Sequence, residues 1–273
     1  SRTHSSPTFV TALYNIGRVD WPSFKRPFSQ YLDRFQHLLA LDIHLIVFGD
    51  AILKPFVAKH RRHRKAATRF VTKPFAKLPA YKHKLRIECI MDSQRFRENN
   101  LILSRPQAFS SDYVILMNSK AALVGEAVRR NPFNTSHFFW IDAGYVAAEH
   151  VCDSEDVNDC QIHIPAGTRW RPEPLLSTEN LVTFVRLNDP DLFVNVTDLH
   201  KLPLESALAG GFFGGSGGVM AYYERLFNKC LLADLAEGTV GEDQRVALNA
   251  YWEQPGIFNL VPGRWFDAYR LFH

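Results

Sequence analysis

The chain has 273 residues, with 32 lysines and arginines against 28 aspartates and glutamates, a formal balance of +4. A hydrophobic content of 46% and a charged content of 22% exclude a disordered chain, and 15 glycines and 15 prolines exclude a collagen-like or low-complexity one. No apolar run approaches the roughly 18 residues of a membrane span, and no signal peptide is recognisable. Because Ser1 stands where a methionine is usual, we expect a processed or truncated form that could have lost an upstream anchor or stem.

The basic residues are concentrated in one segment. Between Asp50 and Glu88 there are twelve lysines and arginines and no acid, which leaves 20 basic and 28 acidic residues elsewhere. The opposite bias occurs from Glu149 to Asp159, with five acids and no lysine or arginine. The usual meaning of such a basic run is a solvated, mobile loop, and we expect one here. The alternative is a segment that binds an anionic acceptor or a membrane surface.

The four cysteines lack the close pairing of a zinc ribbon or finger. Cys152 and Cys160 bracket the acidic stretch and could close it as a disulfide. Asn134 and Asn195 each begin an acceptor sequence for N-glycosylation. Together these features favour the lumen of the secretory pathway, the Golgi in particular, with the bacterial cytoplasm as the alternative.

Hydrophobic periodicity predicts alternating strands and helices in the first half of the chain. The expected elements are a strand over 8–13, a helix over 28–39, a strand over 44–48, a helix over 51–59 and a strand over 68–71. Pro74 and Pro79 indicate an irregular loop after them. This βαβαβ order predicts a parallel sheet with helices on its faces.

The second half continues the alternation. The expected elements are a helix over 113–129, strands over 138–141, 181–187 and 192–196, a glycine-rich loop over 210–218, helices over 219–235 and 242–252, and a strand over 257–261. No linker divides the chain. We therefore predict a single α/β domain over 1–273, with a mixed, mostly parallel central sheet flanked by helices.

An aspartate stands directly after one of the buried strands. Asp142 ends the run from Phe138 to Ile141, and the carboxyl end of such a strand is where α/β sheets place ligands. Ala143 and Gly144 leave room for close approach. A hard cation that carries a diphosphate requires oxygen ligands in such a place. The alternative is an aspartate that caps a turn.

Two further stretches could carry chemistry. Six glycines between Gly210 and Gly218 precede a helix and would let the backbone approach an anionic ligand, with a flexible turn as the alternative. Glu242 and Asp243 open another helix. They could complement the helix dipole, or one could be a general base that deprotonates a hydroxyl nucleophile.

These motifs resemble those of one protein family. The chain is similar over nearly its whole length to the HtrL/YibB family, a group of glycosyltransferase-like proteins. The similarity rests on Thr8 to Arg18 with Trp21, Asn131 to Phe133, Phe139 to Gly144, Gly210 to Ser216 and Gly241 to Gln244. More broadly, the chain resembles GT-A nucleotide-sugar glycosyltransferases, which carry an Asp-x-Asp metal motif, a glycine-rich loop, an x-Glu-Asp motif and a late metal-binding histidine. The first motif would read Asp142-Ala143-Gly144 here, without its second carboxylate.

The resemblance implies a GT-A-like, Rossmann-like domain with a nucleotide-binding half over about 8–145 and an acceptor half over about 146–273. It implies a hexosyltransferase that uses a nucleoside-diphosphate sugar, expected to be a UDP-sugar, and a glycan or glycoconjugate acceptor that could be anionic. Mn²⁺ or Mg²⁺, held by Asp142 and His273, would neutralise the leaving diphosphate. Asp243, with Glu242 beside it, would be the base of an inverting reaction.

The resemblance also implies a set of residues that bind the nucleotide sugar. They are Thr11, Ala12, Tyr14, Arg18, Lys120, Asp142, Ala143, Gly144, Gly214, Gly215 and Ser216. For Lys120, which could reach the donor phosphates or ribose, the alternative is a surface lysine on an amphipathic helix.

Two functions of other classes stay open. A non-catalytic carbohydrate or nucleotide-sugar binding protein would suit the incomplete metal motif, and a polyanion-binding protein could use the basic segment over 54–86. That segment has little aromatic interleaving and no nucleic-acid motif, so a nucleic-acid partner is not expected. Membrane contact is expected only through a missing anchor or stem.

Overall fold

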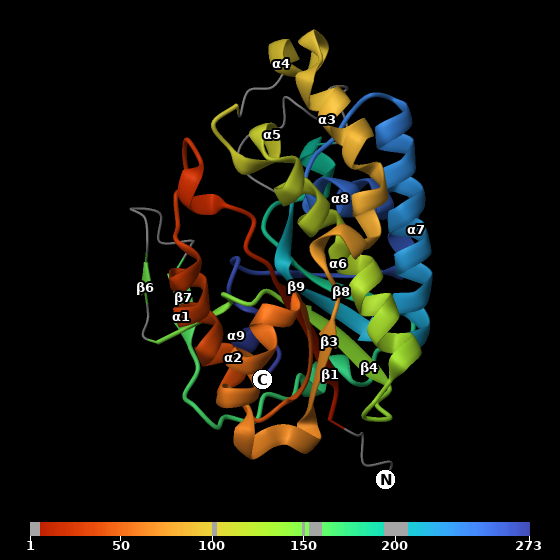
Figure 1. The fold of residues 1–273 in the computed structure, drawn as a ribbon. Helices are drawn as coiled ribbons and strands as arrows, with labels where there is room; N and C mark the ends of the chain where they lie inside the picture. Colours follow the sequence, from red (N-terminus) through yellow and green to blue (C-terminus); the bar gives the residue numbers. More distant parts are fainter. Residues whose placement is uncertain (1–5, 100–102, 149–150, 153–159, 194–206) are drawn as a thin grey trace.

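A seven-stranded sheet lies between two layers of helices in the computed structural model (Figure 1), which describes residues 6–99, 103–148, 151–152, 160–193 and 207–273. Its strand order is β10-β8-β9-β4-β1-β2-β3. The strands are β1 (Thr8–Leu13), β2 (His44–Gly49), β3 (Thr68–Thr72), β4 (His137–Ile141), β8 (Val182–Arg186), β9 (Leu208–Ser216) and β10 (Phe258–Pro262). Only β9 runs antiparallel to its neighbours in this sheet, β4 and β8. The predicted mixed, mostly parallel sheet is confirmed.

Helices cover both faces of this sheet (Figure 1). The helices are α1 (Phe28–Leu39), α2 (Lys54–His60), α3 (Lys84–Asp92), α4 (Gln94–Asn99), α5 (Pro106–Phe109), α6 (Ser111–Arg130), α7 (Gly217–Ala236), α8 (Asp243–Glu253) and α9 (Ala268–Leu271). A second sheet has the order β5-β7-β6, formed by β5 (Val146–Ala147), β6 (Val151–Cys152) and β7 (Cys160–His163). Within the described ranges, no helix is long and apolar enough to cross a membrane.

Strand β1 shows why the central strands are apolar throughout. Phe9 and Leu13 pack into the core cluster that contains α1 and α2, whereas Val10 and Ala12 pack into the cluster that contains α6 and α7. Successive side chains of a strand point to opposite faces, and both faces here are covered. Every residue of β1 is therefore buried.

The strand order places a ligand-binding position at one end of the sheet. The chain proceeds from β1 to β2 and β3 in one direction and then returns to β4 on the other side of β1. Open α/β sheets bind ligands outside the carboxyl ends of their strands at such a change of direction. Asp142 follows β4 at this point, beside the carboxyl end of β1.

The sequence predictions for 8–13 and 28–39 match β1 and α1, but a later one is wrong. Residues 210–218 do not form a glycine-rich loop, because most of them belong to the central strand β9. Gly214 suits this strand because a Cβ there would collide with the carbonyl oxygen of Phe138 on β4. The strand expected over 192–196 begins instead inside a 3-10 helix (Pro190–Phe193), and residues 194–196 lie outside the described residues.

The basic segment over 54–86 is also not the irregular, mobile loop that its charge predicts. It forms α2, β3, the start of α3 and three 3-10 helices, Arg62–Ala67, Phe75–Lys77 and Pro79–His83. Arg61 lies inside the protein, with 1% of its surface exposed. Its guanidinium donates to Thr68 Oγ1 and to the carbonyl oxygens of Leu39, Leu41, Ile43 and Ala67. The charge of Arg61 therefore stabilises the fold through buried hydrogen bonds and is not available to a partner.

The register of the small sheet bears on the predicted disulfide. Cys152 lies directly opposite Cys160 in the antiparallel pair of β6 and β7, but their side chains are not among the parts that the structure describes. The disulfide therefore stays a prediction. Residues 149–150 and 153–159 of the acidic stretch lie outside the described residues, as does the predicted glycosylation site Asn195. Asn134 is exposed in the turn before β4, which leaves glycosylation there a prediction.

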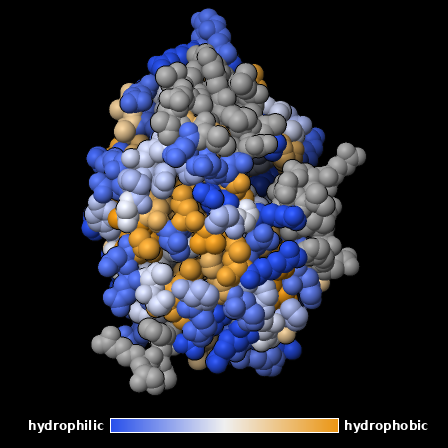
Figure 2. All heavy atoms as spheres, turned by 180° about the vertical axis from the view of Figure 1, so that it is seen from behind, coloured by the Kyte–Doolittle hydropathy of each residue, from blue (hydrophilic) through white to orange (hydrophobic). Residues whose placement is uncertain are grey.

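Hydrophobic side chains also reach the surface. Figure 2 shows a group of them at the centre of the face opposite to that of Figure 1, surrounded by hydrophilic residues. Among the described residues, Ile52 and Leu85 are the most exposed large hydrophobic residues. Because more than half of an ordinary protein surface is apolar, such exposure does not by itself mark a functional site.

Candidate active site

A buried lysine contacts the aspartate at the end of β4. Lys120, from the middle of α6, is 2% exposed, and its Nζ lies 3.1 Å from Oδ1 of Asp142. The alternative of a surface lysine is therefore wrong. Trp140 lies two residues before Asp142, on the same side of the chain, and donates its Nε1–H to the same Oδ1 at 2.7 Å. The Lys120 ammonium also lies over the Trp140 ring, 5.6 Å from its centroid.

Asp243, the first residue of α8, completes this cluster. Its Oδ2 lies 3.0 Å from Lys120 Nζ, and the carbonyl oxygen of Gly210 on β9 accepts a hydrogen bond from the same ammonium, also at 3.0 Å. A lysine ammonium has three N–H groups, and three oxygens surround this one. We call Asp142, Lys120 and Asp243 the charged triad. It joins α6 to β4 and α8, which are far apart in the sequence.

Burial and charge act in opposite directions within the triad. Burial by itself would lower the pKa of Lys120, but the charges of Asp142 and Asp243 outweigh it and raise that pKa above its ordinary value. Burial raises the pKa of Asp243, and the charge of Lys120 partly offsets this rise. Removing one partner of a buried ion pair leaves an uncompensated charge and costs about 3–5 kcal/mol. The triad is thus both a charged site and a structural link.

The two carboxylates differ in what can reach them. The Asp142 side chain is 33% exposed, whereas that of Asp243 is 6% exposed. Only Oδ1 of Asp142 is engaged by residues that the structure describes, so Oδ2 is open to a ligand. Oδ1 of Asp243 is buried and has no hydrogen-bond partner among those residues. A substrate from solvent would therefore meet Asp142 first.

An asparagine positions the loop that leads into α8. Asn118 is 3% exposed and donates its Nδ2–H groups to the carbonyl oxygens of Val114 and Gly241, at 3.0 and 2.7 Å. Glu242 follows as the N-cap of α8, but its side chain makes no capping hydrogen bond. Burial raises the pKa of Glu242. Asn118 was not among the predicted site residues, although a polar residue two positions from Lys120 on a largely apolar helix was a signal for it.

Gly210 also belongs to the site. The sequence predicted it only as part of a glycine-rich loop and not as a binding residue. A Cβ at this position would lie 2.6 Å from Oδ2 of Asp243 and 3.2 Å from Cγ of Gln244. We expect Gly210→Ala to displace Asp243 from Lys120 and to lower the free energy of unfolding by about 1–3 kcal/mol, as overpacking does. Urea unfolding measures this effect. Gly218→Ala is the control, because a Cβ there meets nothing within 4 Å. An unchanged urea midpoint in Gly210→Ala would show that no side chain needs to move.

The first four residues of the predicted nucleotide-binding set lie at and after the carboxyl end of β1. Thr11 and Ala12 are buried in the strand, and the Tyr14 hydroxyl donates to the carbonyl oxygen of Lys73 at 2.9 Å. The guanidinium of Arg18 donates to the Tyr31 hydroxyl at 2.6 Å. It also lies about 5 Å from the ring centroids of Trp21, Tyr31 and Tyr113.

Three predicted glycine-loop residues are not close to Asp142. In the antiparallel pair of β4 and β9, Gly214 lies opposite Phe139, Gly215 opposite Phe138 and Ser216 opposite His137. These positions are at the amino end of β4, about 10 Å or more from Asp142 at a rise of about 3.3 Å per residue. Ser216 is the N-cap of α7. The register instead brings Gly210 and Gly211 to the site, where the Gly211 carbonyl accepts from the Asp142 N–H at 2.9 Å.

The residues around Asp142 do not fit the predicted divalent metal. Oδ1 of Asp142 already accepts a hydrogen bond from Trp140 and forms an ion pair with Lys120. The Lys120 ammonium lies between the carboxylates of Asp142 and Asp243, which a metal would have to bridge. Ala143 and Gly144 offer no ligating side chain. The ring of His273 stacks on Tyr269, with a centroid distance of 4.5 Å. Among the described residues, no group of three or more His, Cys, Asp or Glu could hold a metal ion.

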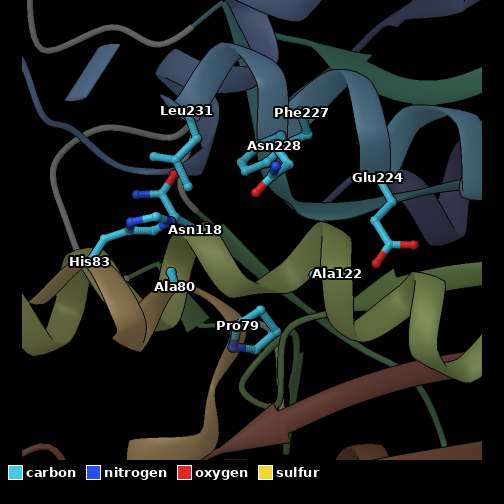
Figure 3. Close-up of a pocket in the computed structure, with 9 residues that line it drawn as sticks. All are labelled: Pro79, Ala80, His83, Asn118, Ala122, Glu224, Phe227, Asn228 and Leu231. Carbon is cyan, nitrogen blue, oxygen red and sulfur yellow. The ribbon is translucent and has the colours of Figure 1, made fainter. Parts of the chain in front are cut away.

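A small cavity lies between α6, α7 and the 3-10 helix Pro79–His83 (Figure 3). Its volume of about 20 Å³ is enough for one water molecule and far too small for a nucleotide. His83 and Asn118 line it, and within the described chain His83 Nε2 and Asn118 Oδ1 are buried without a hydrogen-bond partner. One water molecule could serve both atoms, so this cavity is not the substrate site.

Comparison with known proteins establishes the family. A family model described as "Bacterial protein of unknown function (HtrL_YibB)" matches residues 5–273. The chain belongs to the HtrL/YibB family. One HtrL/YibB relative, Protein HtrL of Escherichia coli (strain K12), is 27% identical over 285 residues, which cover 98% of this chain and 93% of that protein. The resemblance stated from the motifs is therefore confirmed at the level of the family.

One solved structure that the comparison matches to this chain is mouse xyloside xylosyltransferase 1 in its apo form. It shares 11% sequence identity with this HtrL/YibB protein and a TM-score of 0.46, over 94% of this chain and 85% of that one. A similarity at this level does not extend to function, which has to be argued from the site itself.

Proposed function

We propose that this protein transfers a sugar from a nucleoside-diphosphate sugar to a hydroxyl group of an acceptor. The charged triad at the change of direction in the strand order is the observation that carries this proposal. Buried, charge-coupled groups beside a ligand-binding end of a sheet are typical of catalytic sites. The three motifs that resemble those of GT-A glycosyltransferases contain Asp142, Gly210 and Asp243, the residues that surround the Lys120 ammonium.

Arg18 is the residue we assign to the diphosphate of the donor. Its Nη1 donates to Tyr31, and its remaining N–H groups have no hydrogen-bond partner among the described residues. Three aromatic rings hold the guanidinium in place after β1. A planar guanidinium suits phosphate oxygens, and one that is already ordered loses little side-chain entropy when it binds them.

Asp142 is the carboxylate that we assign to the reacting hydroxyl. The acceptor oxygen forms a bond to the anomeric carbon, the bond from that carbon to the diphosphate breaks, and the hydroxyl proton passes to Oδ2 of Asp142. Attack opposite the leaving group inverts the anomeric centre. The motifs implied that Asp243 takes this proton, but the Asp243 side chain is nearly buried and is paired with Lys120. We therefore assign Asp243 the positioning of Lys120 against Asp142.

The basic segment supports a second, separate candidate function. Eight of its basic residues remain exposed although the segment is ordered: Lys54, Lys59, Arg62, Lys65, Arg69, Lys77, Lys82 and Arg86. An ordered array of exposed cations would bind a polyanion, or an anionic acceptor of the transfer reaction, with a steep dependence on salt. Binding of a polyanion such as heparin across a salt series measures that slope.

A thermal-shift screen of nucleoside diphosphates and their sugars tests the proposed function. A ligand that binds only the folded state at about 100 times its Kd adds about 2.7 kcal/mol, which raises Tm by several degrees. We expect at least one nucleoside diphosphate to do so, and inorganic diphosphate, as the control for charge alone, to do so less. If no nucleotide raises Tm, the protein does not use a nucleotide donor. Binding without donor hydrolysis or transfer would identify a non-catalytic binding protein.

A further inference from the structure

Lys120 occupies the space between the two carboxylates of the site. Its Nζ lies 3.1 Å from Asp142, 3.0 Å from Asp243 and 3.0 Å from the Gly210 carbonyl oxygen. We infer that Lys120 is the built-in cation of this site, and that nucleotide binding there does not depend on a divalent metal. The part that concerns nucleotides rests on the proposed function, whereas the part that concerns metals does not.

The contacts of the Lys120 ammonium are the first observation that supports this inference. The ammonium donates a hydrogen bond to the Gly210 carbonyl oxygen and forms ion pairs with Asp142 and Asp243, so oxygens from three separate parts of the chain fix its position. A metal bridging Asp142 and Asp243 would need oxygen ligands at about 2.0–2.6 Å. It would therefore have to occupy the space that Nζ occupies. A metal placed beside the ammonium instead would be repelled by it in a poorly solvated environment.

The other neighbours of Asp142 point the same way. Trp140 donates an N–H to Oδ1 of Asp142 and so takes up a lone pair that a metal would need. Two donors thereby fix the carboxylate and leave only Oδ2 facing outward. One outward oxygen suits a hydrogen bond from a substrate hydroxyl. By contrast, Mg²⁺ and Mn²⁺ sites gather several oxygen ligands around one ion.

Burial explains why a lysine can replace a metal in this role. Lysine is almost never fully buried unless it is paired, and this one is 2% exposed with a carboxylate on either side. The ammonium between the two carboxylates offsets their mutual repulsion, so an external cation is not needed to hold them close together. The triad can thus hold Asp142 ready before any ligand arrives.

Titration with Mn²⁺, followed by electron paramagnetic resonance of the free ion, tests the metal part without any nucleotide. We expect the wild-type protein to leave the free Mn²⁺ signal unchanged at micromolar to millimolar concentrations. Lys120→Met should open the space between the carboxylates and gain Mn²⁺ binding by at least about tenfold, while Lys82→Met, at an exposed lysine, should not. Stoichiometric Mn²⁺ binding by the wild type that Asp142→Asn abolishes would overturn the inference. A folded Lys120→Met protein that ignores Mn²⁺ would also count against it.

Calorimetry with UDP as the probe tests the nucleotide part. We expect the Kd of UDP for the wild type in EDTA to lie within about twofold of its value in excess Mn²⁺. A Kd at least about tenfold weaker in EDTA would overturn the inference even if Lys120→Met fails to fold. If UDP binds under neither condition, UDP is not a ligand and the proposed donor is wrong. The Mn²⁺ titration then still decides whether Lys120 is the cation of the site.

Discussion

Replacing Asp142 by asparagine is expected to abolish most sugar transfer and to leave the protein folded. Asparagine keeps the shape and can still accept from Trp140 and Lys120, but it cannot take the proton of the acceptor hydroxyl. A positioned general base contributes typically about 10²–10⁴-fold in rate, and we expect a loss of kcat in that range with little change in KM for the donor. Initial-rate kinetics, with the product anomer read by NMR, measure this.

Asp243→Asn is the matched control for the assignment of the base. It removes a carboxylate from the same triad, at a position that solvent barely reaches. We expect a smaller loss of kcat, together with a lower free energy of unfolding, because Lys120 loses one of its two charged partners. Glu242→Gln should change kcat least. If Asp243→Asn cripples turnover while Asp142→Asn is mild, the base is Asp243, as the sequence alone predicted. A retained anomer would exclude a single inverting displacement.

Replacing Arg61 by methionine is expected to lower the free energy of unfolding by roughly 3–5 kcal/mol, because several buried oxygens lose their donor at about 1–3 kcal/mol each. The five N–H groups of this guanidinium have five acceptors at 2.6 to 3.2 Å. Three are carbonyl oxygens between the end of α1 and the start of β2, and two lie at the start of β3. Burial lowers the pKa of Arg61 to about 10, so it stays charged at neutral pH. Urea unfolding monitored by tryptophan fluorescence measures the loss.

Arg62→Met is the control for Arg61→Met. It is the next residue and carries the same charge, but its side chain is exposed. A surface substitution of this kind usually changes stability by no more than about 0.5 kcal/mol. Equal effects of the two substitutions would show that net charge in the basic segment matters, and not the hydrogen bonds of Arg61. Arg61 thus differs from the exposed basic residues of this segment, because its guanidinium is used in hydrogen bonds within the fold.

Local sequence patterns were sufficient to predict the strand that ends before Asp142 and the helix that begins at Asp243. An apolar run that ends in Asp142 and a helix that begins near Asp243 are visible in the sequence, because a strand and a helix each impose a period on their side chains. The order of elements around β1 likewise predicted a parallel sheet with helices on both faces. For these features, interactions between residues close in the sequence are sufficient.

Only the tertiary structure decided which residues meet at the site. Lys120 is one polar residue in the long helix α6. Its neighbours in the chain do not indicate that its ammonium lies between Asp142 and Asp243. The glycines of β9 have no side-chain pattern to predict a strand, so β4 and β8 on either side define it by their hydrogen bonds. Arg61 looks like its exposed neighbours in the sequence until the fold brings the carbonyl oxygens of three residues, 18 to 22 positions earlier in the chain, to its guanidinium. Charges and glycines acquire their roles from long-range contacts, because neither has a periodicity that the local sequence could reveal.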